Sequence, residues 1–320
     1  MDKKILVTGA SGFAGSHLID HLIDNNAQNI FGTYYSDKGI ENLDKVKDKI
    51  NLYKVDLTNE QDTKDLIKKI KPDEVYHLAA FASAAGSFSS PVKTVINNIS
   101  SQLNLFESLK KNNLTLTKVL IISSAEVYGD VEPKDLPIDE DTKYNPTNPY
   151  AVSKLTQDFL GRQYFLADNL KIIIARPFNH IGPRQSPDFV VSSFAKKIVE
   201  IEKGKRQPVF PVGNLEAKRD FTDVRDMVKA YFLLMEKGKV GEAYNIGSGV
   251  SYKISDILDK MLSLSNIKVS IESDKSLFRP VDNPDLICNY NKLKNLTGWE
   301  PKIKIENTLK DTLDYFRDIL

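Results

Sequence analysis

The hydrophobic positions divide the first part of the chain into short apolar runs that alternate with longer amphipathic segments. Apolar runs predict buried strands, and apolar positions repeated every three or four residues predict helices. The pattern predicts strands at 5–8, 30–35, 51–57, 74–80, 118–123 and 171–175, and helices at 17–23, 60–70, 91–109 and 150–165. Such alternation is typical of a parallel sheet covered on both faces. We therefore expect an α/β fold with a doubly wound, Rossmann-like parallel sheet.

The alternation weakens after Pro177, where Gly, Pro and Arg become frequent. Further on, apolar positions predict a helix around 224–235, a strand at 243–246 and a final helix with Ile305, Leu309, Leu313 and Phe316 on one face. We expect a first domain at 1–178, to which about 221–247 returns. The segments 179–220 and 248–320 are expected to form a smaller C-terminal lobe.

Composition excludes several classes of protein. The 320 residues carry 44 basic and 43 acidic side chains, and no basic block suggests a nucleic-acid partner. No apolar stretch is long enough to span a membrane. Residues 1–4 lead directly into the first strand, so we expect no signal peptide. The single cysteine, Cys288, cannot form an internal disulfide, which favours a cytoplasmic location.

A glycine-rich turn follows the first strand and precedes the first helix. The glycines are spaced Gly-x-x-Gly-x-x-Gly at Gly9, Gly12 and Gly15. Strand, glycine turn and helix in this order are typical of a dinucleotide site, because the backbone approaches the pyrophosphate closely. The alternative is an ordinary surface turn. The sequence predicts that the first domain binds a dinucleotide through Gly9, Ser11, Gly12, Phe13, Ala14 and Gly15.

The end of the second strand bears on which dinucleotide is bound. An NAD site usually has a carboxylate about 20 residues after the glycines, where it binds the ribose. Thr33, Tyr34 and Tyr35 occupy that place, and the nearest cation is Lys38. The absence of a carboxylate favours NADP(H), but Asp37 keeps NAD(H) open.

Tyr150 and Lys154 are the strongest candidates for chemistry. A spacing of four places both side chains on one face of the predicted helix. An ammonium beside a phenol favours the phenolate, which makes the phenol a better acid near neutral pH. The pair therefore suits proton exchange with a carbonyl or alcohol oxygen. The alternative is a solvated pair on a helix surface, because this spacing is common there.

Other candidates for chemistry are weaker. His17 and His21 share a helix face, but no third ligand has metal spacing, so we predict no metal. Nothing near Cys288 suggests an activated nucleophile.

Several further motifs carry a resemblance that covers almost the whole chain. They are 56–57 (DL), 77–80 (HLAA), 123–129 (SSAEVYG), 176–183 (RPFNHIGP), 213–226 (GNLEAKRDFTDVRD), 244–249 (YNIGSG), 279–280 (RP) and 297–299 (TGW). With the glycine turn and the Tyr150/Lys154 pair, they resemble the extended short-chain dehydrogenase/reductase family, in particular its nucleotide-sugar-modifying members. The segments 176–183 and 213–226 are most similar to reductases that act on GDP-4-keto-6-deoxy-D-mannose.

The resemblance implies a role for individual residues. Ser124, Tyr150 and Lys154 would be catalytic, with Tyr150 protonating the C4 oxygen. Besides the glycine turn, the cofactor would contact Asp56, Leu57, Leu78, Ala79, Ala80, Tyr150 and Lys154. The GDP-sugar substrate would contact Ser83, Asn179, Arg219 and Arg279, since arginines bind phosphate well. For Arg219 the alternative is a surface ion pair with Asp220 or Asp223.

The implied reaction is reduction of a 4-keto group by NAD(P)H to give GDP-D-rhamnose. Glu126 leaves a second reading open, because related GDP-mannose 4,6-dehydratases use a glutamate at this position as a base. The Ser at position 124 and the lack of an Arg- and Ser-rich insertion after the second strand favour the reductase. A dehydratase or epimerase is therefore the alternative, and a non-catalytic NADP-binding sensor is a remote one.

The predicted helices 91–109 and 150–165 bear on the oligomeric state. Each carries apolar positions beyond one sheet-facing stripe, such as Leu105 and Leu160. In related enzymes these helices pair two subunits. We therefore expect a homodimer, in which a two-fold helical bundle buries the additional apolar positions.

Overall fold

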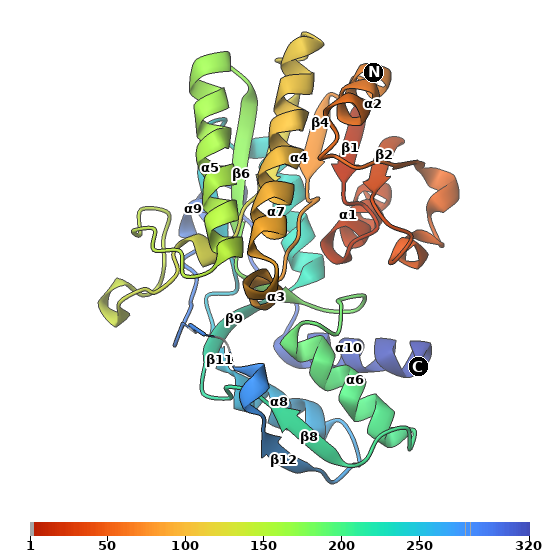
Figure 1. Cartoon of the computed structure of the whole chain (residues 1–320), viewed down its shortest axis with the longest axis vertical. Coiled ribbons are helices and arrows are strands. Elements are labelled where there is room, and N and C mark those ends of the chain that lie inside the picture. Colours follow the sequence, from red (N-terminus) through yellow and green to blue (C-terminus); the bar gives the residue numbers. More distant parts are fainter. Residues whose placement is uncertain (1–2, 279, 282) are drawn as a thin grey trace.

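A computed structural model describes residues 3–278, 280–281 and 283–320 (Figure 1). The upper part of Figure 1 holds a large sheet with helices on both sides, and the lower part a smaller lobe of helices and short strands. Within the described residues, no helix combines the length and the apolar character that crossing a membrane requires.

The large sheet has seven strands in the order β10-β6-β5-β4-β1-β2-β3, and every neighbouring pair is parallel. Its strands are β1 (Lys4–Thr8), β2 (Asn29–Tyr34), β3 (Asn51–Lys54), β4 (Glu74–His77), β5 (Lys118–Ile122), β6 (Lys171–Pro177) and β10 (Ala243–Ile246). The predicted parallel sheet is confirmed. The predicted strands at 51–57 and 74–80 are too long, because both end three residues earlier.

Helices cover both faces of this sheet. One face carries α1 (Phe13–Asp24), α7 (Val224–Lys237) and α9 (Asn291–Thr297), and the other carries α2 (Glu60–Ile70), α4 (Pro91–Lys111) and α5 (Pro149–Asp168). Successive side chains of a strand point to opposite faces. Ile5 and Val7 of β1 therefore join the core with α1 and α7, while Leu6 joins the core with α2, α4 and α5.

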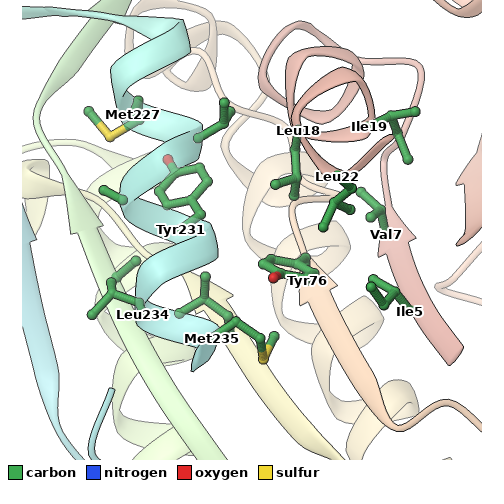
Figure 2. Close-up of a cluster of buried hydrophobic side chains, with 14 of the residues drawn as sticks. Ile5, Val7, Leu18, Ile19, Leu22, Tyr76, Met227, Tyr231, Leu234 and Met235 are labelled. Carbon is green, nitrogen blue, oxygen red and sulfur yellow. The ribbon is translucent and has the colours of Figure 1, made fainter. Parts of the chain in front are cut away.

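Figure 2 shows the first of these cores. Leu18 and Leu22 of α1 and Tyr231 of α7 lie near Val7 of β1 and Tyr76 of β4. All five side chains are fully buried or nearly so. Each such side chain contributes roughly 1.5–3 kcal/mol relative to an exposed one, so this cluster holds the two helices firmly on the sheet.

The smaller lobe has its own hydrophobic core. It contains α6 (Val190–Glu202), α8 (Ile254–Ser263), α10 (Ile305–Ile319) and two small sheets. One sheet has the order β11-β9-β7, formed by β7 (Asn179–Ile181), β9 (Lys218–Asp223) and β11 (Ser251–Lys253), and the other pairs β8 (Val209–Val212) with β12 (Ser270–Ser273). Leu293 and Trp299 pack instead in the core of the large sheet. The predicted domain boundaries stay a prediction.

The homodimer prediction rested on Leu105 and Leu160, and their own chain covers both side chains at least partly. Leu105 is only 1% exposed and lies in the core between the sheet and α4. Leu160 of α5 is partly buried against the same core. Leu105 is therefore used within one chain, whereas Leu160 is only partly covered by its own chain.

Candidate active site

The glycine turn between β1 and α1 lets two parts of the backbone approach each other closely. Gly9 has a φ of +70°, and a Cβ added there would lie 3.0 Å from the backbone of Ala79. A Cβ on Gly15 would lie 2.1 Å from the carbonyl oxygen of Gly9. No described side chain caps α1 at Gly12, so the first N–H groups of the helix remain available to an anion. This turn fits the pyrophosphate of a dinucleotide.

A cleft of about 220 Å³ opens beside this turn. It brings together eight of the predicted cofactor residues, Gly9, Ser11, Gly12, Asp56, Leu57, Leu78, Ala79 and Ala80. Residues 55–57 and 78–80 line it because β3 and β4 end just before them. Phe13, Ala14 and Gly15 form the first turn of α1 and do not line the cleft. The Phe13 ring stacks on the His180 ring, with the ring centres 5.7 Å apart.

Six residues of this cleft escaped the sequence analysis. They are Ser36, Val55, Thr58, Phe81, Asn97 and Ser101. Asn97 and Ser101 lie one turn apart on α4, and polar residues at that spacing on one helix face were the signal that could have indicated them. The backbone N–H of Phe81 donates to Asn98 of α4 at 2.8 Å, which places Phe81 at the cleft.

The end of β2 also faces the cleft. Thr33, Tyr34, Tyr35 and Ser36 line it. The carboxylate of Asp37, which kept NAD(H) open, accepts a hydrogen bond from Lys54 at 2.7 Å.

The structure brings the three predicted catalytic residues together. Asn148 caps α5 by accepting a hydrogen bond from the Ala151 N–H at 2.8 Å, and this start of the helix sets the register of Tyr150. Ser124, which follows β5, lies near the Tyr150 phenol and acts to lower its pKa. The Lys154 Nζ lies 5.8 Å from the centre of the Tyr150 ring. The alternative of a solvated surface pair is wrong, since both residues are buried.

Burial dominates the acid–base properties of this pair. It raises the pKa of Tyr150, against a lowering contribution from Ser124. It lowers the pKa of Lys154 to about 7, although Asp158 opposes the change. The predicted lowering of the Tyr150 pKa is therefore absent in this structure. Burial disfavours the charged phenolate more than the neighbouring Ser124 favours it.

Glu126 belongs to this constellation. It lies in a short 3₁₀ turn, Ala125–Val127, directly after Ser124. One carboxylate oxygen, Oε2, accepts a hydrogen bond from Asn148 at 3.0 Å. Its charge lies close enough to Tyr150 to raise the pKa of the phenol further. Glu126 is thus held at the site by the residue that caps α5.

The predicted substrate residues lie on different elements. Ser83 caps the short helix α3 (Ala84–Ser89) through a hydrogen bond to the Gly86 N–H at 2.9 Å. Asn179 begins β7, which pairs with β9 in parallel, so that Asn179 is the register partner of Phe221. Arg219, two positions before Phe221, therefore lies on the strand next to Asn179.

Arg219 is only 6% exposed, so its side chain is buried and does not lie on the surface. Its guanidinium donates to the carbonyl oxygens of Lys218 and Asn283, each at 2.7 Å. Asp223 pairs with Arg225 at 2.7 Å. Arg279, the other predicted diphosphate ligand, lies outside the described residues.

The two histidines considered as metal ligands have other partners. The His17 Nε2 contacts the carbonyl oxygen of Pro183 at 2.9 Å, and His21 packs edge-on against Phe232. Among the residues that the structure describes, no group of three His, Cys, Asp or Glu side chains could hold a metal ion.

Comparison with known proteins places this site in a family. The family model described as GDP-mannose 4,6 dehydratase matches residues 6–312. The chain belongs to this family. GDP-6-deoxy-D-mannose reductase of Pseudomonas aeruginosa is 33% identical over 98% of this chain and 97% of the relative.

Two solved structures agree with this membership. RMD from Pseudomonas aeruginosa complexed with NADPH superposes with a TM-score of 0.85 at 31% identity, covering 99% of this chain and 100% of that one. UDP-glucose 4-epimerase of Thermotoga maritima with UDP-glucose gives a TM-score of 0.89 at 30% identity, covering 99% of both chains. The resemblance to extended short-chain dehydrogenases/reductases is confirmed. This family member is an NAD(P)-dependent nucleotide-sugar enzyme, so the non-catalytic sensor is set aside.

Replacing Tyr150 with Phe tests the proton donor. The variant should bind NADPH about as well as the wild type, and its turnover should fall roughly a hundred- to ten-thousand-fold, because general acid catalysis is worth that much. Cofactor fluorescence and steady-state rates measure the two quantities. Tyr164→Phe is the matched control, since this tyrosine of α5 donates to Glu107 at 2.7 Å, away from the site. Equal rates in both variants would reject Tyr150 as the acid.

Proposed function

We propose that this enzyme reduces the 4-keto group of GDP-4-keto-6-deoxy-D-mannose with NADPH to give GDP-6-deoxy-D-mannose, also called GDP-D-rhamnose. The observation that carries the proposal is the burial of Tyr150 beside Ser124, with the buried Lys154 one turn along α5. The similarity to a GDP-6-deoxy-D-mannose reductase over nearly the whole chain supports this choice of substrate.

The three side chains divide the work of the reduction. The bound nicotinamide supplies the hydride. Ser124 and Tyr150 present two adjacent hydroxyl groups to the carbonyl oxygen, and Tyr150 gives it a proton. The phenolate that remains is stabilised by the Lys154 ammonium, which matters most here because burial disfavours the phenolate.

For the cofactor we propose a preference for NADP(H). No carboxylate occurs at Thr33–Ser36 in the cleft, and Asp37 is engaged by Lys54, which weakens the case for a carboxylate that binds the ribose of NAD. The NADPH complex of RMD supports the same choice, while other neighbours were solved with NAD. An NADPH-dependent enzyme with one buried free cysteine suits the reducing cytoplasm, where we place it.

The second candidate is a 4,6-dehydratase. The position of Glu126 favours it, because a carboxylate beside Tyr150 could serve as a base on the sugar. The family model, which is named for such a dehydratase, points the same way.

One assay separates the two candidates. Given GDP-4-keto-6-deoxy-D-mannose, a reductase consumes one NADPH for each product, and NADH should serve less well. Given GDP-D-mannose, a dehydratase releases water without net loss of NADPH absorbance. Glu126→Gln keeps an oxygen that can accept from Asn148, so it should retain most reductase turnover but abolish dehydration. Dehydration of GDP-D-mannose that depends on Glu126 would overturn the reductase.

Arg219 should bind the substrate diphosphate. Arg219→Gln should raise KM for the nucleotide sugar about ten- to a hundredfold, since a charge-assisted hydrogen bond is worth roughly 1.5–3 kcal/mol. The NADPH Kd should stay nearly unchanged. Arg225→Gln is the control, because Arg225 pairs with Asp223 and Asp311 in the same lobe. An unchanged substrate KM in Arg219→Gln would leave Arg219 with a structural role only.

We also propose that two copies pair through α4 and α5. Their outer faces expose Val92 (68%) and Ile96 (57%) on α4 and Val152 (44%) and Phe159 (53%) on α5. Val92 and Ile96 lie one turn apart, and Val152 and Phe159 lie two turns apart, so each helix presents one apolar stripe. A second copy related by a two-fold axis would cover both stripes with its own.

Light scattering should therefore give about twice the mass of one chain at micromolar concentration. Val92→Glu/Ile96→Glu should shift the mass toward the monomer, because four charges would be buried at a two-fold interface. Leu116→Glu should not, since Leu116 is 82% exposed in the loop after α4. A monomeric wild type contradicts the proposed dimer.

A further inference from the structure

Three consecutive residues at the end of β5 bind three consecutive turns of α5. Ser124 lies near Tyr150 and acts to lower the pKa of its phenol. The carbonyl oxygen of Ile122 accepts a hydrogen bond from the Lys154 Nζ at 2.7 Å. The Ser123 Oγ lies 3.4 Å from Asp158, one turn beyond Lys154. The first two contacts involve predicted catalytic residues, whereas the third involves Asp158, which has no role in the proposed reaction.

Asp158 is a buried carboxylate, and its side chain is only 3% exposed. Its Oδ2 accepts a hydrogen bond from Arg176 Nε at 2.8 Å as well as the bond from Ser123. Its Oδ1 is buried and has no hydrogen-bond partner among the described protein groups. A buried ion pair gains little stability, because desolvation of both charges offsets their attraction. Stability alone therefore does not explain why this pair lies beside the site.

Arg176 is held firmly from several directions. Its guanidinium donates to the hydroxyls of Tyr128 and Tyr144 at 2.9 and 2.6 Å, and stacks on both rings. The Tyr128 hydroxyl donates in turn to Asn245 at 2.8 Å. Burial raises the pKa of Asp158, and the Arg176 guanidinium at 2.8 Å opposes this rise. A carboxylate paired with a firmly held guanidinium therefore lies one helical turn from Lys154.

Among the described residues, the titratable neighbours of Lys154 lie on α5 and β4. On α5 they are the neutral phenol of Tyr150 and the carboxylate of Asp158. On β4 the neighbour is His77, whose pKa burial and the Lys154 charge lower to about 3, so it is neutral. Arg176 on β6 lies beyond Asp158, whose carboxylate it contacts. Asp158 is thus the anion that offsets the burial of the Lys154 ammonium.

We propose that Asp158 is a positioning residue whose charge, held in place by Arg176, keeps Lys154 in its ammonium form while the site works. The Ser123 hydroxyl lies 3.4 Å from Asp158 and 3.4 Å from the carbonyl oxygen of Lys154. Asp158 therefore also helps to anchor the turn of α5 that carries Lys154 to the end of β5. The inference rests on the proposed function for its catalytic part only. Asp158 would act through Lys154 and would not touch the substrate.

Removing the charge should change the pH dependence. Burial already brings the pKa of Lys154 to about 7, and without Asp158 it should fall further. Since a lysine loses its charge as pH rises, Asp158→Asn should lose activity at lower pH than the wild type. The ratio of turnover near pH 6 to turnover near pH 8.5 should rise about fivefold for a fall of roughly one pKa unit, because turnover near pH 6 also drops by about half. Asp158→Glu keeps the charge and should restore most of the wild-type profile.

NADPH affinity, measured by cofactor fluorescence without any sugar, gives a second readout. Because the Lys154 ammonium is expected at the nicotinamide ribose, NADPH binding by Asp158→Asn should weaken at lower pH than in the wild type. Asp168→Asn is the control, since Asp168 ends α5 and pairs with Lys110 at the far end. If Asp158→Asn does not fold, Asp158→Asn/Arg176→Met removes both buried charges. The pH dependence of its NADPH binding should shift to lower pH in the same way.

Two results would contradict the role of Asp158, and a different result would contradict the proposed function. Wild-type pH dependence of NADPH binding in Asp158→Asn, or in the double variant, overturns the role of Asp158. A loss that is equal at every pH and is shared by Asp158→Glu also overturns it, because that result indicates packing alone. If the keto-sugar is not a substrate, the proposed function fails, while the NADPH readout still decides the role of Asp158.

Discussion

The contact between the buried face of α5 and the carboxyl end of β5 is the constraint on which the candidate site depends. Tyr150 and Lys154 at this spacing would be an ordinary polar pair on an exposed helix. Buried against β5, the phenol gains a partner in Ser124 and the ammonium gains the carbonyl oxygen of Ile122. The same burial lowers the pKa of Lys154 to about 7, so its charge becomes sensitive to every neighbouring group.

The position of α5 is fixed by hydrogen bonds as well as by apolar contact. Asn98 of α4 donates to the Ser153 hydroxyl at 2.9 Å, Gln102 donates to the Gln157 carbonyl oxygen at 2.8 Å, and Gln157 donates back to the Asn98 carbonyl oxygen at 2.8 Å. Apolar surfaces alone would tolerate small rotations of one helix against the other. A shift by one residue would turn Tyr150 by about 100°, away from Ser124, and these directional bonds oppose it.

The two lobes are joined beside the glycine turn. His180, next to Asn179, stacks on Phe13 at the start of α1. Arg184 pairs with Asp20 of the same helix at 2.7 Å. In the smaller lobe, the buried Asp220 accepts hydrogen bonds from the backbone N–H groups of Ser248, Gly249 and Cys288, and this fixes β9 and its Arg219. The segments predicted to contact substrate are thereby tied to the element that shapes the cleft beside the glycine turn.

The sequence by itself determined the parallel sheet, the glycine turn and the Tyr150/Lys154 pair, because each depends on local periodicity or on a short fixed spacing. It could not determine which apolar positions stay exposed on α4 and α5, and the choice of Leu105 was wrong for that reason. Nor could it show that burial raises the pKa of Tyr150, or that Asp158 and Arg176 meet, since Asp158 and Arg176 come from different elements. Only the tertiary structure decided these points, because burial and pairing across elements set the charge states on which the chemistry depends.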